Sequence, residues 1–221
     1  MKKLLVIFGF GDIAQLAHYY FTTDSDYEVV AFTLDSDYIT EEAYCGLPVV
    51  PFEEICQHYA PEKYEIFVAL SYAKLNVVRK EKYLAAKALG YRLASYISSR
   101  STILNERHIG ENCFIFEDNT IQPFVTIGDN VTIWSGNHIG HHSAINDHCF
   151  ISSHVVVSGG VEIGQMCFIG VNATLRDHIK IGEKCVIGAG TLLLADAEAG
   201  GLYIGKATER AAMPSASLTR I

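Results

Sequence analysis

Residues 132–151 read TIWSGNHIGHHSAINDHCFI, and an isoleucine recurs there at every sixth position. The spacing continues in both directions from Ile97 to Leu193, and a large aliphatic residue stands at every step. A six-residue repeat is typical of a parallel β-helix, in which each hexapeptide supplies a short strand and a turn. The repeat positions are Ile97, Ile103, Ile109, Ile115, Ile121, Ile127, Ile133, Ile139, Ile145, Ile151, Val157, Ile163, Ile169, Leu175, Ile181, Ile187 and Leu193.

The unbroken spacing predicts an all-β domain, a left-handed parallel β-helix, over residues 97–194. Three hexapeptides complete a coil of roughly eighteen residues, so residues eighteen apart stack at about 4.8 Å. No repeat is skipped, which predicts that no loop leaves the helix. Residues 195–221 are expected to form a strand and a tail that cap the open end, because an uncovered β-helix terminus promotes aggregation.

Residues 1–96 have a different pattern, with apolar strand-like runs that alternate with helical segments. This order is typical of a small α/β domain with a parallel sheet, a Rossmann-like fold. We expect strands at 4–8, 28–34, 47–50, 65–70 and 92–96. Helices are expected from about 12 to 21, from Pro51 and over 74–89, the last ended by Gly90.

The composition narrows the classes of partner. The formal net charge is −8, which argues against nucleic acid, since phosphate binding needs clustered Lys and Arg. No stretch approaches the roughly 20 apolar residues that span a bilayer, and the start of the chain does not resemble a signal peptide. These features predict a cytoplasmic protein without a membrane span.

Four of the six cysteines follow a repeat position by four residues, where the side chain points inward and small residues fit. They are therefore expected to be core residues, and no C-x-x-C pair indicates a zinc site. These cysteines are Cys113, Cys149, Cys167 and Cys185.

The segment Gly9–Phe10–Gly11–Asp12–Ile13–Ala14 fits the pattern G-x-G-x-x-A between a strand and a helix. Such a turn binds phosphate or nucleotide at the helix N-terminus, and Asp35 ends the second strand where it could accept hydrogen bonds from a ribose or a base. A tight packing turn without a ligand is the alternative. The domain is short for a dinucleotide, so a nucleotide attached to another group fits it better.

Histidine is concentrated in the repeats, and imidazole is suited to proton transfer near neutral pH. His141 and His142 follow Ile139 in a turn and should point outward. Gly159 lies one coil beyond His141 and should leave a notch beside the imidazole, where a glycine amide could face a thioester carbonyl. Trp134 and Asn137 are expected to converge on this notch.

The remaining histidines suggest less. His148 and His178 are expected to be surface turn residues. His142 and His178 are two coils apart, which raises the alternative of a metal site between subunits like that of γ-class carbonic anhydrases. Glu183 stands where that pattern has a third histidine, so no metal is expected.

The order of a short Rossmann-like domain and a hexapeptide β-helix resembles the bacterial nucleotide-sugar acetyltransferases. This group includes the UDP-4-amino-sugar N-acetyltransferases of the bacillosamine pathway and the sialic-acid O-acetyltransferases. The resemblance runs from Leu5 to about Gly205. It implies an acetyl-CoA-dependent sugar N-acetyltransferase of surface-glycan (lipopolysaccharide) biosynthesis that forms a homotrimer, with active sites shared between subunits.

The resemblance also implies roles for individual residues. The family's catalytic histidine falls on His141, as general base for the sugar amine, and its next, often acidic, residue is His142. An asparagine that contacts the sugar is replaced by Trp134, and Asn137 could take over its polar role. The oxyanion amide falls on Gly159, the nucleotide over Gly9, Phe10, Gly11, Asp12 and Asp35, and acetyl-CoA along Val171, Gly188 and Ala189.

Two other functions remain open from the sequence. O-acylation of a sugar hydroxyl would use the same site with a harder nucleophile. A non-catalytic scaffold or a metal-binding β-helix would need neither acetyl-CoA nor an amino sugar.

Overall fold

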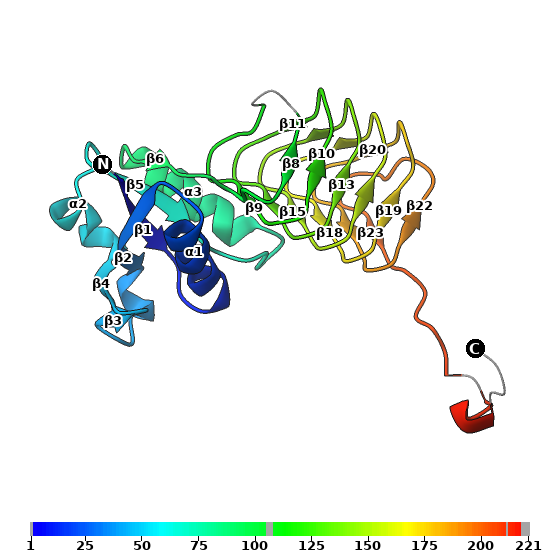
Figure 1. Ribbon diagram of the computed structural model, residues 1–221, viewed down its shortest axis with the longest axis horizontal. Coiled ribbons are helices and arrows are strands. Elements are labelled where there is room, and N and C mark those ends of the chain that lie inside the picture. The colour runs from blue at the N-terminus through cyan, green and yellow to red at the C-terminus, as the bar shows by residue number, and fades with distance from the viewer. Residues whose placement is uncertain (1, 105–107, 211, 218–221) are drawn as a thin grey trace.

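The computed structural model describes residues 2–104, 108–210 and 212–217. An α/β domain stands beside a long parallel β-helix, and residues 206–210 and 212–217 lie away from the body (Figure 1). The predicted architecture is confirmed in both parts.

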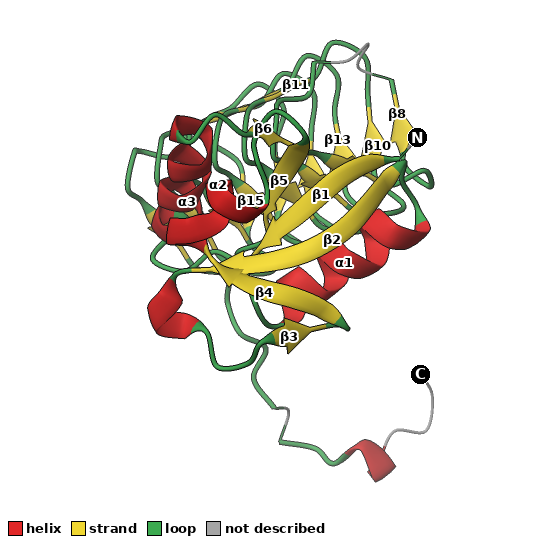
Figure 2. Ribbon diagram, turned by 90° about the vertical axis from the view of Figure 1, so that its left-hand side faces the viewer, coloured by secondary structure: helices red, strands yellow, loops and turns green. Residues whose placement is uncertain are grey.

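The α/β domain contains one sheet with helices on both faces (Figure 2). The strand order is β3-β4-β2-β1-β5-β6, and every neighbouring pair is parallel except β3 with β4. The elements are β1 (Lys3–Phe8), α1 (Asp12–Thr23), β2 (Tyr27–Leu34), β3 (Ala43–Tyr44), β4 (Leu47–Pro51), α2 (Ile55–His58), β5 (Tyr64–Val68), α3 (Val77–Ala88) and β6 (Arg92–Leu93), with short 3-10 turns at Ser36–Tyr38 and Phe52–Glu54.

Two apolar clusters cover the sheet. Phe21 of α1 packs against one face with Phe32 and Phe67. Tyr83 of α3 packs against the other with Ile66. Because the order reverses between β2 and β5 on either side of β1, the loop after β1 opens at the crevice where such sheets bind ligands.

The start of the third helix differs from the prediction. Lys74, Leu75 and Asn76 have positive φ angles of 50°, 53° and 64°, and α3 begins only at Val77. A left-handed conformation costs a non-glycine residue roughly 1–2 kcal/mol, so no periodic pattern predicts three in succession. At the other end Gly90, with φ 89°, terminates the helix as expected.

The β-helix has three faces, each a parallel sheet whose strands are two residues long. Neighbouring strands pair residues eighteen apart, such as Ile133 with Ile151. The first face is β7 (Tyr96–Ile97), β9 (Phe114–Ile115), β12 (Thr132–Ile133), β15 (Phe150–Ile151), β18 (Phe168–Ile169), β21 (Val186–Ile187) and β23 (Leu202–Tyr203). The second is β8 (Thr102–Ile103), β10 (Thr120–Ile121), β13 (His138–Ile139), β16 (Val156–Val157), β19 (Thr174–Leu175) and β22 (Leu192–Leu193). The third is β11 (Thr126–Ile127), β14 (Ala144–Ile145), β17 (Glu162–Ile163) and β20 (Lys180–Ile181).

The repeat positions form the core, as predicted. All of them from Ile115 to Leu193 are buried, whereas Ile97 in the first coil is 37% exposed because no coil lies below it. The four cysteines of the repeats are buried, and Cys149 and Cys167 each donate to a backbone carbonyl of the next coil, fifteen residues further along the chain. Their assignment to the core is confirmed.

The corners share one backbone feature. Every sixth residue from Asn112 to Gly190 has a positive φ angle, so each turn of the helix bends through one left-handed residue. Asparagine, aspartate, histidine and glycine tolerate this conformation best, which explains why several histidines stand at corners.

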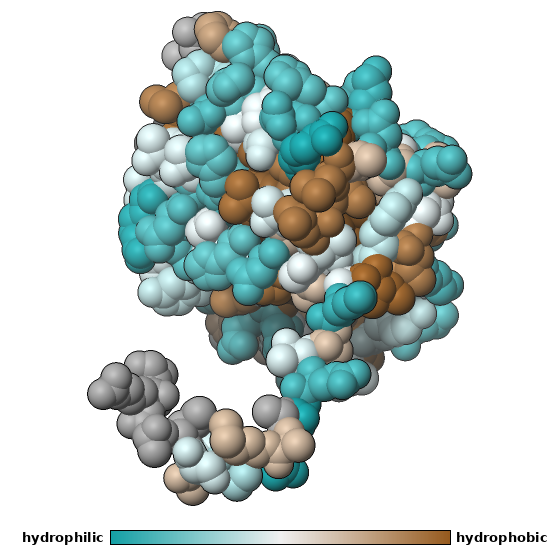
Figure 3. Space-filling view, turned by 90° about the vertical axis from the view of Figure 1, so that its right-hand side faces the viewer, coloured by the Kyte–Doolittle hydropathy of each residue, from teal (hydrophilic) through white to brown (hydrophobic). Residues whose placement is uncertain are grey.

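The last coil is shorter than the repeat predicts. Tyr203 of β23 pairs with Ile187, sixteen residues earlier, so the β-helix continues past the predicted boundary at 194. Gly205 still lies against Ala189 and Gly190, and residues 206–210 then leave the helix without covering its end. Leu192, Leu194 and Leu202 are exposed there, and the space-filling view of this end shows hydrophobic surface (Figure 3). The prediction that this tail caps the end is wrong for residues 206–210.

The two parts are joined through α3 and an aromatic cluster. Phe114 and Phe116 of the first coils pack with Tyr20 of α1. On another corner α3 covers His148, which is 6% exposed and lies against Tyr83. The prediction of a surface role for His148 is therefore wrong, whereas His178 is exposed as expected.

Candidate functional site

His141 and His142 lie in the corner that follows β13, and both are exposed. The backbone N–H of His141 donates to Gln122 Oε1 at 2.9 Å. His141 Nδ1 lies 3.1 Å from His142 Nδ1, and the His142 ring packs on Phe124 with 4.7 Å between centroids. The second imidazole therefore holds the first in place, as an orienting partner would.

Gly159 lies directly beside the His141 ring, as the repeat predicts. A Cβ at Gly159 would lie 2.7 Å from His141 Cε1, so only glycine leaves room for the imidazole. Gly160 donates its N–H to the His141 carbonyl at 2.8 Å, whereas the Gly159 N–H has no acceptor among residues that the structure describes. The corner thus presents an exposed imidazole beside a free backbone donor, which are the groups needed for proton transfer and for stabilising an oxyanion.

Asn137 does not join this corner, contrary to expectation. It is 2% exposed, its Oδ1 accepts from the Val155 N–H at 2.7 Å, and its side-chain N–H donates to the Trp134 carbonyl. Both ends of the amide are occupied within the β-helix, so Asn137 shapes a turn and is not available to a ligand.

Trp134 lies at a different corner, the one that follows the first face. It stacks on Phe116 with 4.7 Å between centroids and 6° between planes. Together with Val171 and Ala189 it lines a groove of about 400 Å³ along the first face. The structure therefore joins Trp134 to expected cofactor residues and separates it from His141.

Aromatic residues that were not predicted complete this groove. Phe150 and Phe168 stack one coil apart, and Tyr72, from the segment after β5, contacts both rings at 5.0 and 4.8 Å. The signal for the two phenylalanines is their outward position directly before a repeat residue, eighteen apart. Gly188 does not line the groove; its N–H donates to the Tyr203 carbonyl at 2.7 Å beneath the last strand.

The turn after β1 forms an open cradle in the α/β domain. Gly9 is required because a Cβ there would lie 2.5 Å from the Ala69 carbonyl oxygen. Gly11 precedes α1 with φ 80° and open space around it, and no side chain caps the helix. Uncapped N–H groups at a helix N-terminus bind anions, and Phe10 and Asp12 are exposed beside them.

Asp35 lies near the cradle with a partner of its own. Its carboxylate is 2.5 Å from Lys82 Nζ of α3, and each side chain is 24% exposed. A ligand that uses Asp35 would share it with Lys82, which places a cation as well as a carboxylate at this edge of the sheet.

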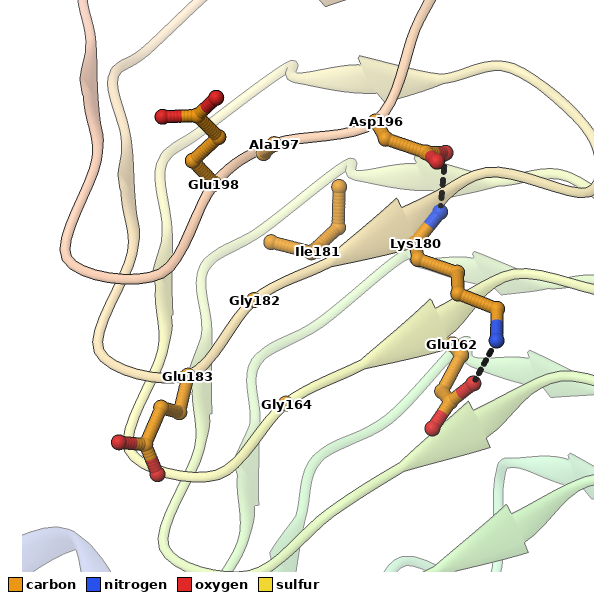
Figure 4. A pocket seen from close by; sticks show the side chains of 9 residues that line it. All are labelled: Glu162, Gly164, Lys180, Ile181, Gly182, Glu183, Asp196, Ala197 and Glu198. Carbon is orange, nitrogen blue, oxygen red and sulfur yellow. Dashed lines mark hydrogen bonds and ion pairs between the residues drawn. The ribbon is translucent and has the colours of Figure 1, made fainter.

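A further pocket lies on the third face near the end of the β-helix (Figure 4). Lys180 lies between Glu162, whose carboxylate is 3.5 Å from Nζ, and Asp196, which accepts from the Lys180 N–H at 2.8 Å. Lys180 is thus paired inside this pocket, Glu183 interacts with Gln165 and Lys184 outside its lining, and the pocket contains none of the predicted site residues.

Across residues 2–104, 108–210 and 212–217, no three His, Cys, Asp or Glu side chains are grouped to hold a metal ion. No helix in these ranges has the length and apolarity to cross a bilayer.

Comparison with known proteins supports the fold. The model of the bacterial transferase hexapeptide family (six repeats) matches residues 108–141, 124–159 and 160–195. A search of curated proteins gave no match. The chain therefore carries transferase hexapeptide repeats along most of its β-helix.

Solved structures match both parts of the chain. The acetyltransferase domain of PglB from Neisseria gonorrhoeae has a TM-score of 0.82 and 24% identity, over 92% of this chain and 97% of that one. A variant of perosamine N-acetyltransferase from Caulobacter crescentus, in complex with CoA and GDP-perosamine, has a TM-score of 0.80 and 24% identity, over 91% and 93%. WeeI from Acinetobacter baumannii has a TM-score of 0.78 and 19% identity, over 92% and 97%. At these identities the similarity shows a shared fold.

Proposed function

We propose that this protein transfers an acetyl group from acetyl-CoA to the amino group of a nucleotide-linked amino sugar. The observation that carries the proposal is the exposed His141 imidazole beside the bare backbone of Gly159. The fold shared with the PglB acetyltransferase domain and with perosamine N-acetyltransferase supports it.

In this reaction His141 is the general base. A sugar ammonium must lose a proton before its nitrogen can attack the thioester carbonyl, and imidazole accepts protons near neutral pH. The Gly159 N–H would donate to the oxygen of the tetrahedral intermediate, which then expels CoA thiolate. His142 orients the base, in the place of the acidic neighbour that the sequence resemblance leads one to expect.

The groove and the cradle would bind the two substrates. No Lys, Arg, Asp or Glu lines the groove of Trp134, Val171 and Ala189, so it suits the neutral pantetheine arm of acetyl-CoA. The cradle of Gly9 and Gly11 suits the diphosphate of a nucleotide sugar, because uncapped N–H groups meet anions there. Their glycines, rather than charged side chains, make room for the phosphates.

We further propose a homotrimer with shared active sites. In one protomer His141 and the groove lie on different corners of the β-helix, which supports a site completed by a neighbouring subunit. Both proposed substrates are metabolites of the cytoplasm. This supports a cytoplasmic location for the protein and a role in surface-glycan (lipopolysaccharide) biosynthesis.

The test is release of CoA thiol from acetyl-CoA with UDP-, dTDP- and GDP-linked 3-amino and 4-amino sugars, each beside its hydroxy counterpart. We expect turnover with an amino sugar, and a fall in kcat of about 10²–10⁴-fold for His141→Ala. His178→Ala, at the same corner two coils away, is the control. Turnover only with hydroxy sugars would show that the protein is an O-acetyltransferase rather than an N-acetyltransferase. Full activity of His141→Ala would refute the assignment of His141 as the general base.

A further inference from the structure

Arg79 of α3 is a buried charge, 1% exposed, without a carboxylate partner among the residues described. Its guanidinium donates to backbone carbonyls of the β-helix instead. Nη1 bonds Asn130 O and Thr132 Oγ1 at 2.8 Å, and Nη2 bonds His148 O and Cys149 O at 3.1 Å. Burial lowers the pKa of Arg79 to about 10, so the group stays charged at neutral pH.

Asn76 extends this contact to a third coil. It is fully buried, its Oδ1 accepts from Arg79 Nη2 at 2.9 Å, and its Nδ2 donates to Cys167 O at 3.3 Å. Asn76 is also the last of the three left-handed residues that begin at Lys74. Arg79 and Asn76 thus fasten a strained turn to three successive coils of the β-helix.

That turn ends a segment, residues 69–76, that we call the strap. The strap starts at the cradle, where the Ala69 N–H donates to Phe8 O at 2.8 Å and the Ala69 carbonyl lies against Gly9. Midway, Tyr72 lies on Phe150 and Phe168 and forms one wall of the groove. The strap therefore connects the two places where the proposed substrates bind.

We propose that Arg79 is a positioning residue of the acetyl-transfer site, which fixes the strap, and with it Tyr72, at the distance from the cradle that the reaction needs. The inference rests on the proposed function. Unpaired buried charge and left-handed non-glycine residues are both costly, and they persist where the surrounding structure fixes them, often at functional sites. A fixed geometry between bound reactants is a large part of the rate that an enzyme gains.

The experiment uses the chain's single tryptophan, Trp134, which lines the same groove as Tyr72 and whose Nε1 is buried with no hydrogen-bond partner among the described residues. In Arg79→Met, and less in Arg79→Lys, release of the strap should hydrate the indole. Emission should shift to longer wavelength, acrylamide quenching should rise, and kcat/KM for acetyl-CoA, which the groove is proposed to bind, should fall by up to about 10²-fold. KM for acetyl-CoA should change more than KM for the acceptor, with partial rescue by lysine.

Tyr83→Phe is the matched control on the same helix. It removes hydroxyl contacts to Glu111 and Asp129 but leaves the strap untouched, so it should lower stability without changing Trp134 emission or KM. A folded Arg79→Met protein with wild-type emission, quenching and KM would overturn the proposal.

If the Arg79 variants do not fold, Tyr72→Ala tests the same strap, because Tyr72 is 52% exposed. Wild-type emission and KM in that variant would also overturn the proposal. The fluorescence needs no substrate. Absence of acetyl transfer by the wild-type protein would therefore refute the proposed function, while a changed emission would still support the role of Arg79 in fixing the groove.

Discussion

At the scale of single residues, the contact between His141 and Gly159 is the best-defined feature of the candidate site. The two lie eighteen residues apart, and the repeat alone predicts that they stack. The structure adds that the imidazole fills the space above the glycine, so the notch holds the base itself.

Gly159→Ala should therefore lower the proposed acetyl transfer without unfolding the protein. The new Cβ would lie within 3 Å of the His141 ring and displace it, while the φ angle of Gly159 is one that alanine adopts. We expect kcat to fall by at least about tenfold. In a His141→Ala background the same change should cost little more, because the imidazole is already gone. Additive losses in this double-mutant cycle would contradict a direct contact.

At the scale of elements, each repeat position from Ile115 onward contributes to one continuous core. Ile151→Ala should lower the free energy of unfolding by about 2–5 kcal/mol, since it leaves a cavity between packed coils. Ile97→Ala is the same substitution at another repeat position, but Ile97 lies in the partly exposed first coil. It should therefore lower the free energy of unfolding clearly less than Ile151→Ala does. Urea denaturation of both variants measures this, and equal losses would contradict the gradient of burial.

A polar ladder crosses the coils beneath α3. Asn112 Nδ2 donates to Asn130 Oδ1 at 2.8 Å, and Asn130 Nδ2 lies 3.0 Å from His148 Nδ1. Burial, with Lys80 and Arg79 nearby, lowers the pKa of His148 to about 4, while Asp147 and Asp129 act in the opposite direction. The neutral ring is thus the form that the folded protein holds.

The lowered pKa of His148 makes the stability of the folded protein depend on pH. In the unfolded chain the histidine binds a proton near pH 6.5, so the unfolded state takes up more protons and stability falls as pH drops from about 6.5 toward 4. His148→Asn fits the left-handed corner and still accepts from Asn130, so it should flatten this part of the profile. His178→Asn, at an exposed left-handed corner, should not. Urea midpoints at pH 7 and pH 5 test both.

At the scale of the whole molecule, the sequence predicted the features that follow from the six-residue repeat. It missed the features that depend on how the α/β domain packs against the β-helix. The repeat predicted the three faces, the buried cysteines and the corner of His141. The burial of His148, the role of Arg79 and the place of Tyr72 follow from where α3 and the strap meet the β-helix. Those contacts join residues 51 or more positions apart, such as Arg79 with Asn130, and no local pattern encodes them.

The assembly can be tested by mixing two inactive variants. His141→Ala removes the base, and Ala189→Trp should fill the groove at an exposed position. If one subunit supplies the base and its neighbour the groove, refolding an equal mixture should restore about a quarter of wild-type activity. Light scattering should give three times the chain mass of 24.4 kDa. A monomeric mass, or no recovery on mixing, would contradict a shared site.

The eighteen-residue pairing also constrains how such a chain can change in length during evolution. Adding or deleting one whole coil keeps every later strand on its own face and every later corner in its own column, and only the strands next to the change gain new partners. Adding a single hexapeptide would turn all later residues by one face, and any corner contact that spans the insertion, such as His141 with Gly159, would be lost. Proteins of this architecture should therefore differ in length by multiples of eighteen residues when the difference lies between α3 and the corner at His178.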